Sequence, residues 1–90
     1  MKKLTEQEII VAVNTVLNEV LEIDKEKLKP EATLFDELGL DSLDAVDMVA
    51  GLQEKFGVSL RNDERVRAVR KLSDVYVLVA TIQNEMDEKP

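Results

Sequence analysis

The sequence predicts an all-α fold: a small bundle of three main helices plus one short helix, with a long loop between the first two helices. Apolar residues recur at helical spacing in three separate stretches of the chain. Each stretch follows residue types that cap helices well. Only one short run has strand-like composition, and it has no second strand to pair with. Since 90 residues make one domain at most, we treat residues 1–90 as a single domain.

The first helix is predicted over residues 5–21. Thr5 is followed three residues later by Glu8, which is a capping box in which each side chain accepts a hydrogen bond from the other residue's backbone N–H. Apolar residues then repeat on one helical face and beside it: Ile9, Val13, Val16 and Val20, flanked by Ile10, Leu17 and Leu21. Many of them are β-branched, which lowers helix propensity, so packing must hold this helix.

A long connection without sustained periodicity follows over residues 22–41. Pro30 breaks any helix there, and scattered apolar residues are expected to anchor the loop: Ile23, Leu28, Leu34, Phe35, Leu38 and Leu40. We expect a short turn at 34–38 and a tight bend at Gly39. Loops of this length in compact domains are often functional.

The second helix is predicted over residues 42–55. Asp41 is a good N-cap, and Asp44 stands three residues later in capping-box register. The inward face repeats at helical spacing: Ala45, Met48, Val49, Leu52 and Phe56. Gly57 provides a C-terminal stop. Gly51 costs roughly 1 kcal/mol relative to Ala inside a helix, which predicts a close packing contact at this position.

The last third of the chain predicts a short helix over 62–71 and a final helix over 73–86. Their caps are predicted at Asn62 or Asp63 and at Ser73 and Asp74. The final helix has inward residues at helical spacing: Val75, Leu78, Val79, Ile82 and Met86. The run 75–79 also fits a strand by propensity, but we prefer a helix because no second strand is available.

The charge of the chain is concentrated in one segment. The net charge is −7, and residues 30–54 hold seven acids and no Lys or Arg, while the remaining acids and bases cancel. Residues 61–71 are locally basic, with five Lys or Arg against two acids. A negative face argues against a binder of nucleic acids or anionic membranes and favours a protein partner with a basic patch.

Several residue types and segments are absent, and each absence excludes a class of function. The chain has no Cys, His or Trp, so it lacks a thiolate nucleophile, the usual general base and the commonest metal ligand. No stretch approaches the roughly 20 apolar residues of a membrane span, and Met-Lys-Lys is not followed by the apolar run of a signal peptide. We expect a cytoplasmic protein that is not an enzyme and has no catalytic residues or metal site.

The motif Leu38-Gly39-Leu40-Asp41-Ser42-Leu43 carries the strongest functional signal. It resembles the Leu-Gly-x-Asp-Ser-Leu signature of acyl carrier proteins, and the order of helices and loop over residues 5–84 is similar to that family. The resemblance implies that Ser42 carries a 4′-phosphopantetheine arm, derived from coenzyme A and attached by a separate phosphopantetheinyl transferase with magnesium. It further implies that Asp41 both caps the helix and helps that transferase to dock.

The position of Ser42 fits this role on physical grounds. It follows an N-cap, where free backbone N–H groups and the helix dipole favour a phosphate. The family likeness also implies a docking face on the second helix for acyl-transfer, condensing and reducing enzymes with basic patches, formed here by Leu43, Asp44, Val46, Asp47 and Glu54. An acyl chain folded back between the helices would have these candidate contacts: Val13, Phe35, Met48, Leu52, Phe56, Leu60 and Ile82. We expect a monomer.

The basic segment 61–71 departs from the family pattern. Common fatty-acid carriers place further acids there, and the spacing from Phe56 to Val75 is longer than usual, with Arg61 where a Pro is often found. A housekeeping carrier of fatty-acid synthesis and a dedicated carrier for a specialised lipid or polyketide-like product both fit. Two other possibilities stay open, namely an aminoacyl or peptidyl carrier with the same arm and an unmodified helical adaptor that binds a basic partner through residues 31–54.

Overall fold

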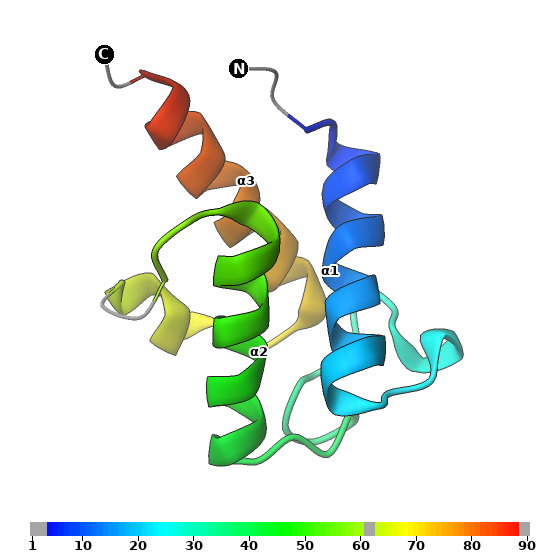
Figure 1. Ribbon diagram of the computed structural model, residues 1–90. Helices are drawn as coiled ribbons and strands as arrows, with labels where there is room; N and C mark the ends of the chain where they lie inside the picture. The colour runs from blue at the N-terminus through cyan, green and yellow to red at the C-terminus, as the bar shows by residue number, and fades with distance from the viewer. Residues whose placement is uncertain (1–3, 61–62, 89–90) are drawn as a thin grey trace.

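Three α-helices and two short 3₁₀ helices form the structure, as the sequence predicts for an all-α bundle (Figure 1). The computed structural model describes the backbone of residues 4–60 and 63–88 and the side chains of residues 4–60 and 63–85. The elements are α1 (Glu6–Leu21), η1 (Lys25–Lys27), α2 (Ser42–Phe56), η2 (Glu64–Ala68) and α3 (Leu72–Glu88). Helices α2 and α3 each pack against α1. No helix in the described part of the chain is long and apolar enough to cross a membrane.

Helix α1 begins with the predicted capping box. The Glu8 N–H donates to Thr5 Oγ1 at 3.1 Å, and the Thr5 N–H donates to Glu8 Oε1 at 2.8 Å. Glu22, in the left-handed region with φ 57°, ends the helix. One inward prediction is wrong, because Val20 is 45% exposed. Val20 faces Gly51 of α2, whose missing side chain leaves it partly uncovered.

The loop between α1 and α2 is anchored to the core and to the start of α3. Four predicted anchors are buried: Ile23, Leu28, Leu34 and Leu40. Phe35 was expected among them but is 47% exposed, because the chain turns over residues 34–37. The Leu34 N–H donates to the Arg70 carbonyl oxygen at 2.9 Å, and the Leu72 N–H donates to the Ala32 carbonyl oxygen at 2.9 Å. These two bonds fix the loop across the base of α3.

The same pairing explains why the predicted helix over 62–71 is wrong in length. The observed η2 is a 3₁₀ helix of five residues, Glu64–Ala68, followed by Val69 with extended backbone. An isolated β-bridge joins Thr33 to Lys71. Because the chain must be extended there to pair with the loop, a helix cannot continue through this point.

The caps of the last two helices are partly as predicted. Asp63 caps η2 by accepting from the Arg65 N–H at 2.9 Å, whereas the alternative cap Asn62 lies outside the described residues. Helix α3 extends the predicted helix by one residue at its start and two at its end. Ser73 therefore lies inside the first turn and is not the cap. Asp74 lies in the same turn and is not the N-cap either, but its carboxylate accepts from the N–H groups of Arg70 and Lys71, both at 3.0 Å, as the third residue of a capping box does.

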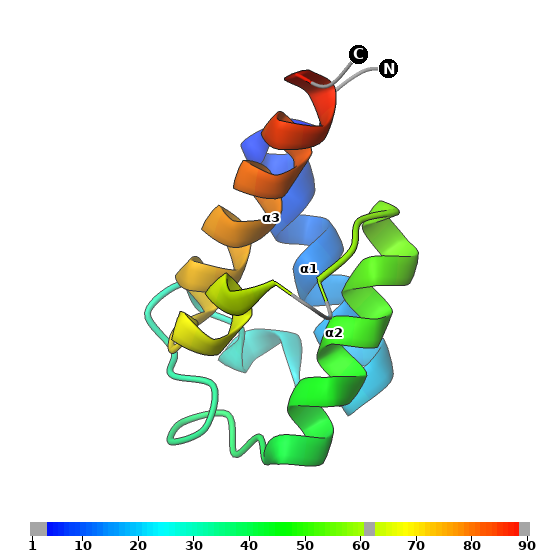
Figure 2. The same ribbon diagram turned by 90° about the vertical axis from the view of Figure 1, so that its left-hand side faces the viewer.

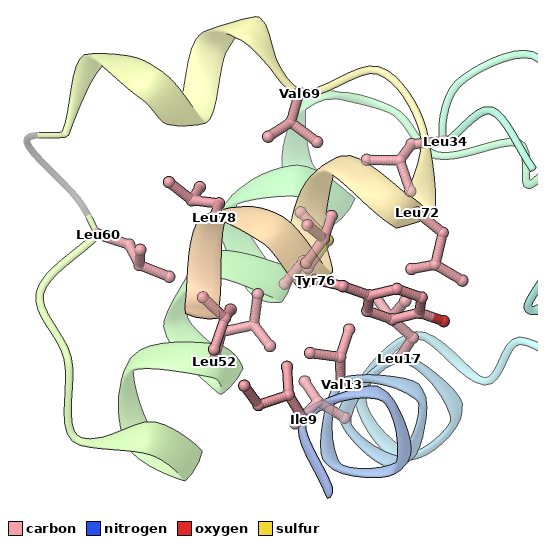
Figure 3. Packing of buried hydrophobic residues seen from close by; sticks show 14 of the residues in the cluster. Ile9, Val13, Leu17, Leu34, Leu52, Leu60, Val69, Leu72, Tyr76 and Leu78 are labelled. Carbon is pink, nitrogen blue, oxygen red and sulfur yellow. The ribbon is translucent and has the colours of Figure 1, made fainter. Parts of the chain in front are cut away.

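The run 75–79 is helical, and the strand alternative is wrong. Val75, Tyr76, Leu78 and Val79 are buried while Val77 is exposed, which is a helical pattern of burial. Figure 3 shows Tyr76 and Leu78 of α3 in one apolar cluster with side chains of α1 and α2 such as Val13 and Leu52. Seven side chains are almost completely buried: Leu17, Leu52, Leu60, Leu72, Val13, Val75 and Val79. The Met86 side chain, predicted to point inward, lies outside those described.

Candidate functional site

The N-terminus of α2 presents Ser42 to solvent on a well-defined helix start. The Asp44 N–H donates to Asp41 Oδ1 at 2.9 Å, and the Asp41 N–H donates to Asp44 Oδ2 at 3.2 Å, so the predicted capping box is present. Gly39, with φ 70°, makes the bend that leads into this cap. Ser42 is exposed as the first helical residue. As at any helix start, the first N–H groups have no intrahelical acceptor, so they can bind a phosphate beside the serine hydroxyl.

The chemistry available to Ser42 alone is limited. The chain contains no His, and the carboxylates of Asp41 and Asp44 are engaged in the capping box. No group beside the hydroxyl is therefore placed to deprotonate it. Among the described residues, no cluster of three or more His, Cys, Asp or Glu is arranged to hold a metal ion. The site offers an exposed hydroxyl that another protein must activate.

One exposed face of α2 runs downstream from Ser42. We call the residues Leu43, Val46, Asp47 and Glu54 the docking face. Leu43 is 75% exposed and Val46 is 63% exposed, and the two residues are neighbours one turn apart on this face. Asp47 and Glu54 lie two turns apart on this face and are exposed. Asp44, predicted with them, is half-buried by its contact with Asp41. An apolar centre flanked by carboxylates suits a basic protein surface.

A small apolar cavity of about 50 Å³ lies beneath α2. Four of the predicted acyl contacts line it: Phe35, Met48, Leu52 and Leu60. The other three candidates lie elsewhere, with Val13 and Ile82 buried in the core and Phe56 half-buried against it. The sequence-based set missed eight lining residues: Leu34, Ala45, Val49, Val66, Val69, Val75, Leu78 and Val79. The helical spacing of Val75, Leu78 and Val79 in the sequence indicates that these three share one face of α3 and could have identified them.

The segment η2 is held by a cluster of charges that the sequence did not predict. We call Asp63, Arg65 and Glu85 the Arg65 cluster. The Arg65 guanidinium donates to both carboxylate oxygens of Asp63, at 2.9 and 2.7 Å, and to both of Glu85, at 2.8 and 3.0 Å. Hydrogen bonds from the side chain and backbone of Arg65 lower the pKa of Asp63 to about 2. The cluster joins η2 to the C-terminal half of α3.

Comparison with known proteins agrees with this geometry. A family model described as "Phosphopantetheine attachment site" matches residues 12–72, which include Ser42. The chain is 39% identical to "Acyl carrier protein 2" of Ralstonia nicotianae over 79 residues, covering 88% of this chain and 96% of that protein. It is 35% identical to "Acyl carrier protein" of Thermosynechococcus vestitus over 72 residues, covering 80% of this chain and 88% of that protein.

A solved structure is similar as well. The crystal structure of an acyl carrier protein from Thermotoga maritima superimposes with a TM-score of 0.77 at 29% identity. The match covers 91% of this chain and 94% of that one. The likeness therefore extends over nearly the whole fold in addition to the motif around Ser42.

Proposed function

The chain belongs to the acyl carrier protein family, and from this premise we propose that Ser42 is the residue that carries the 4′-phosphopantetheine arm. The protein is a carrier and not an enzyme, and its cofactor is covalently attached 4′-phosphopantetheine. The observation that carries the assignment to Ser42 is its exposed position as the first residue of a capped helix. The arm supplies the thiol that this cysteine-free chain lacks.

The residues around Ser42 have distinct roles in this proposal. The Ser42 oxygen bonds to the phosphorus of coenzyme A that bears the pantetheine arm, the P–O bond of the pyrophosphate breaks, and adenosine 3′,5′-bisphosphate leaves. The serine proton passes to a base of the transferase, since the carboxylates of Asp41 and Asp44 accept from each other's backbone. The N–H groups of the first turn of α2 lie where they favour the phosphate charge. Asp41 holds the helix start in place and offers its exposed edge to the transferase.

Acyl carrier proteins act with partner enzymes, and we assign their contact to the docking face together with Asp41 and Asp44. The partners expected are the phosphopantetheinyl transferase and the acyl-transfer, condensing and reducing enzymes, each with a basic patch. The apolar centre at Leu43 and Val46 supports this assignment, since exposed apolar residues ringed by charges mark protein contacts. A cytoplasmic location and a monomeric state are part of the same proposal.

The cavity beneath α2 is the proposed site for the acyl chain. Met48, Leu52 and Leu60 line it as buried side chains, and Phe35 lines it from an exposed position. Phe35 is the most exposed of the four and is therefore the expected entrance. The mass of the acyl group recovered on the protein purified from its source would identify the cargo and distinguish an acyl from an aminoacyl or peptidyl group.

Intact mass spectrometry tests the assignment of Ser42. Incubation with coenzyme A, magnesium and a broad-specificity phosphopantetheinyl transferase is expected to add the mass of one phosphopantetheine. The Ser42→Ala variant should gain nothing, whereas Ser59→Ala, which alters another exposed serine, should be modified like the wild type. If the wild-type mass stays unchanged while the same transferase modifies a second carrier protein, this chain is better described as an unmodified adaptor.

The kinetics of the same transferase test the docking face. Asp47→Lys is expected to lower kcat/KM severalfold, and added salt should lower the wild-type value in the same direction, because both weaken attraction to a basic patch. Glu19→Lys makes the same charge change at an exposed position of α1 and should have little effect. A rate that is insensitive to salt and to Asp47 would remove the electrostatic part of the proposal.

A further inference from the structure

A groove of about 360 Å³ runs between α2 and η2, beside the docking face. Its floor is apolar, with Val46, Val49 and Ala50 on α2 and Val66 on η2. Figure 2 shows η2 beside the start of α3, facing α2. Val46 belongs both to the groove and to the docking face. A partner that covers the docking face therefore reaches the groove as well.

The charges around the groove differ from one side to the other. On the η2 side the groove is lined by Arg67 and by Asp63, whose carboxylate is already bound by Arg65. On the α2 side the lining residues carry no charge, and the exposed acids Asp47 and Glu54 lie on the adjoining docking face. Among the described side chains, no cation forms an ion pair with either acid, and no carboxylate forms one with Arg67. The groove and the docking face together form a surface with negative charge on the α2 side, positive charge at Arg67 and an apolar centre.

Among the described arginines of residues 61–71, the Arg67 guanidinium alone makes no hydrogen bond or ion pair with another described residue. Arg65 is bound on both sides by Asp63 and Glu85. The Arg70 guanidinium donates to the carbonyl oxygens of Arg67 and Val69, at 2.7 and 3.0 Å.

We propose that the α2–η2 groove receives an apolar side chain of partner enzymes that place basic residues against α2 and a carboxylate against Arg67. This inference rests on the proposed carrier function and narrows the class of partner. An apolar residue seated in the groove removes Val46 from water. The charges that flank the groove set the orientation of the bound partner and discriminate between partners, because a partner with a wholly basic patch would place a cation against Arg67. The bipolar surface thus favours enzymes with a mixed patch over enzymes that serve uniformly acidic carriers.

A pair of probe enzymes tests the proposal. The first probe is a carrier-dependent condensing enzyme whose docking patch contains only Arg and Lys, and the second is the same enzyme with the patch residue facing η2 changed to Glu. Binding of the holo-protein, with its arm verified by mass, is measured for both probes. The wild type is expected to prefer the Glu-bearing probe by roughly tenfold, and Arg67→Glu to reverse this preference. Lys25→Glu, an equal charge change at a distant exposed site, should leave it unaltered.

Other results would overturn the proposal. One is that the wild type prefers the all-basic probe and that Arg67→Glu binds the two probes in the same ratio as the wild type does. A low-salt dimer dissolved by Arg67→Glu in sedimentation experiments would also overturn it, since the groove would then be filled by a second copy. Val46→Ser is expected to weaken both probes equally, and an unchanged affinity would exclude the groove as the contact. Failure of the transferase to load the arm would contradict the assignment of Ser42, whereas the ratio of the two binding affinities tests only the groove.

Discussion

Helix α2 and η2 lie on opposite sides of one groove but are held by different physical interactions. Helix α2 buries Met48 and Leu52, is capped at Asp41, and contacts α1 closely at Gly51. The segment η2 has no fully buried residue: Val66 packs half-buried against the core, and the other contacts that hold η2 are exposed hydrogen bonds and ion pairs around Arg65. Packing sets the position of the first element, whereas the position of the second depends much more on charge.

The difference matters for how the molecule is used. A serine that many enzymes must find is best placed on an element whose position does not change with conditions. An element held by surface charges opens locally at low free energy and responds to salt. The neighbouring η2 can therefore adjust to different partners or cargo while Ser42 keeps its place. The predictions below separate the packed from the charge-held element.

The largest effect is expected where α2 meets α1. A Cβ atom at Gly51 would lie 2.8 Å from Val16 Cγ1 and 3.3 Å from Val20 Cγ2. Val16 is buried and β-branched, so it cannot move aside. Gly51→Val should lower the free energy of unfolding by about 3 kcal/mol through overpacking, measured by urea denaturation. Ala50→Val, on the exposed side of the same turn, is the control, and an equally small loss for both variants would contradict a tight contact.

A smaller global effect is expected for a polar side-chain hydrogen bond between α1 and α3. The Tyr76 hydroxyl donates to Asn14 Oδ1 at 2.6 Å. Tyr76→Phe leaves that oxygen without its donor and should cost about 1 kcal/mol, a fall in Tm of roughly 4–8 °C for a domain of this size. Asn14→Ala in the Tyr76→Phe background should add little if the pair acts as a unit.

Tyr76 also allows a test by pH. Burial raises the pKa of its phenol above the usual 10. The fold favours the protonated form, so this contribution to stability is complete below pH 10 and is lost as the pH rises through the folded-state value. Because the chain has one Tyr and no Trp, ultraviolet absorbance reports this titration alone. A midpoint at or below 10 in the folded protein would contradict the burial of the Tyr76 phenol.

The parts of the fold that could be predicted from sequence are those with local causes. Both capping boxes, at Thr5 and Asp41, depend on residues three positions apart. The close contact at Gly51 follows from the cost of an otherwise unexplained glycine in a helix. The length of η2 could not be predicted, because it is set by the bridge between Thr33 and Lys71, which are far apart in the chain.

The candidate site divides in the same way. The exposed place of Ser42 follows from its own neighbours in sequence. The Arg65–Glu85 pair joins residues twenty positions apart, and the position of Arg67 on the groove depends on how η2 packs beside α2. A run of charged residues in the sequence does not show which of them form ion pairs within the folded protein.

A local effect is expected when the Arg65 cluster is broken. Arg65→Gln removes the ion pairs with Asp63 and Glu85 that connect η2 to α3. Amide hydrogen exchange over residues 64–68 should become severalfold faster, while exchange in α2 and modification of Ser42 stay unchanged. High salt should speed exchange at 64–68 in the wild type in the same way. Equal acceleration in α2 would show that the two elements are not held separately.

The smallest and most local effect is expected from acid. Arg65 lowers the pKa of Asp63 from 3.8 to about 2. A carboxylate whose pKa is lowered in the folded state contributes stability that is present above the unfolded value and is lost as the pH falls through the folded value. The ion pair between Asp63 and Arg65 at η2 should therefore persist at pH 4 and weaken between about pH 4 and pH 2.

Carboxyl carbon chemical shifts of Asp63 measure the midpoint of its titration directly. Glu85→Gln should keep it low because the Asp63–Arg65 pair remains, whereas Arg65→Gln should return it toward 3.8. A low midpoint that survives Arg65→Gln would mean that the Arg65 side chain does not hold η2 through Asp63.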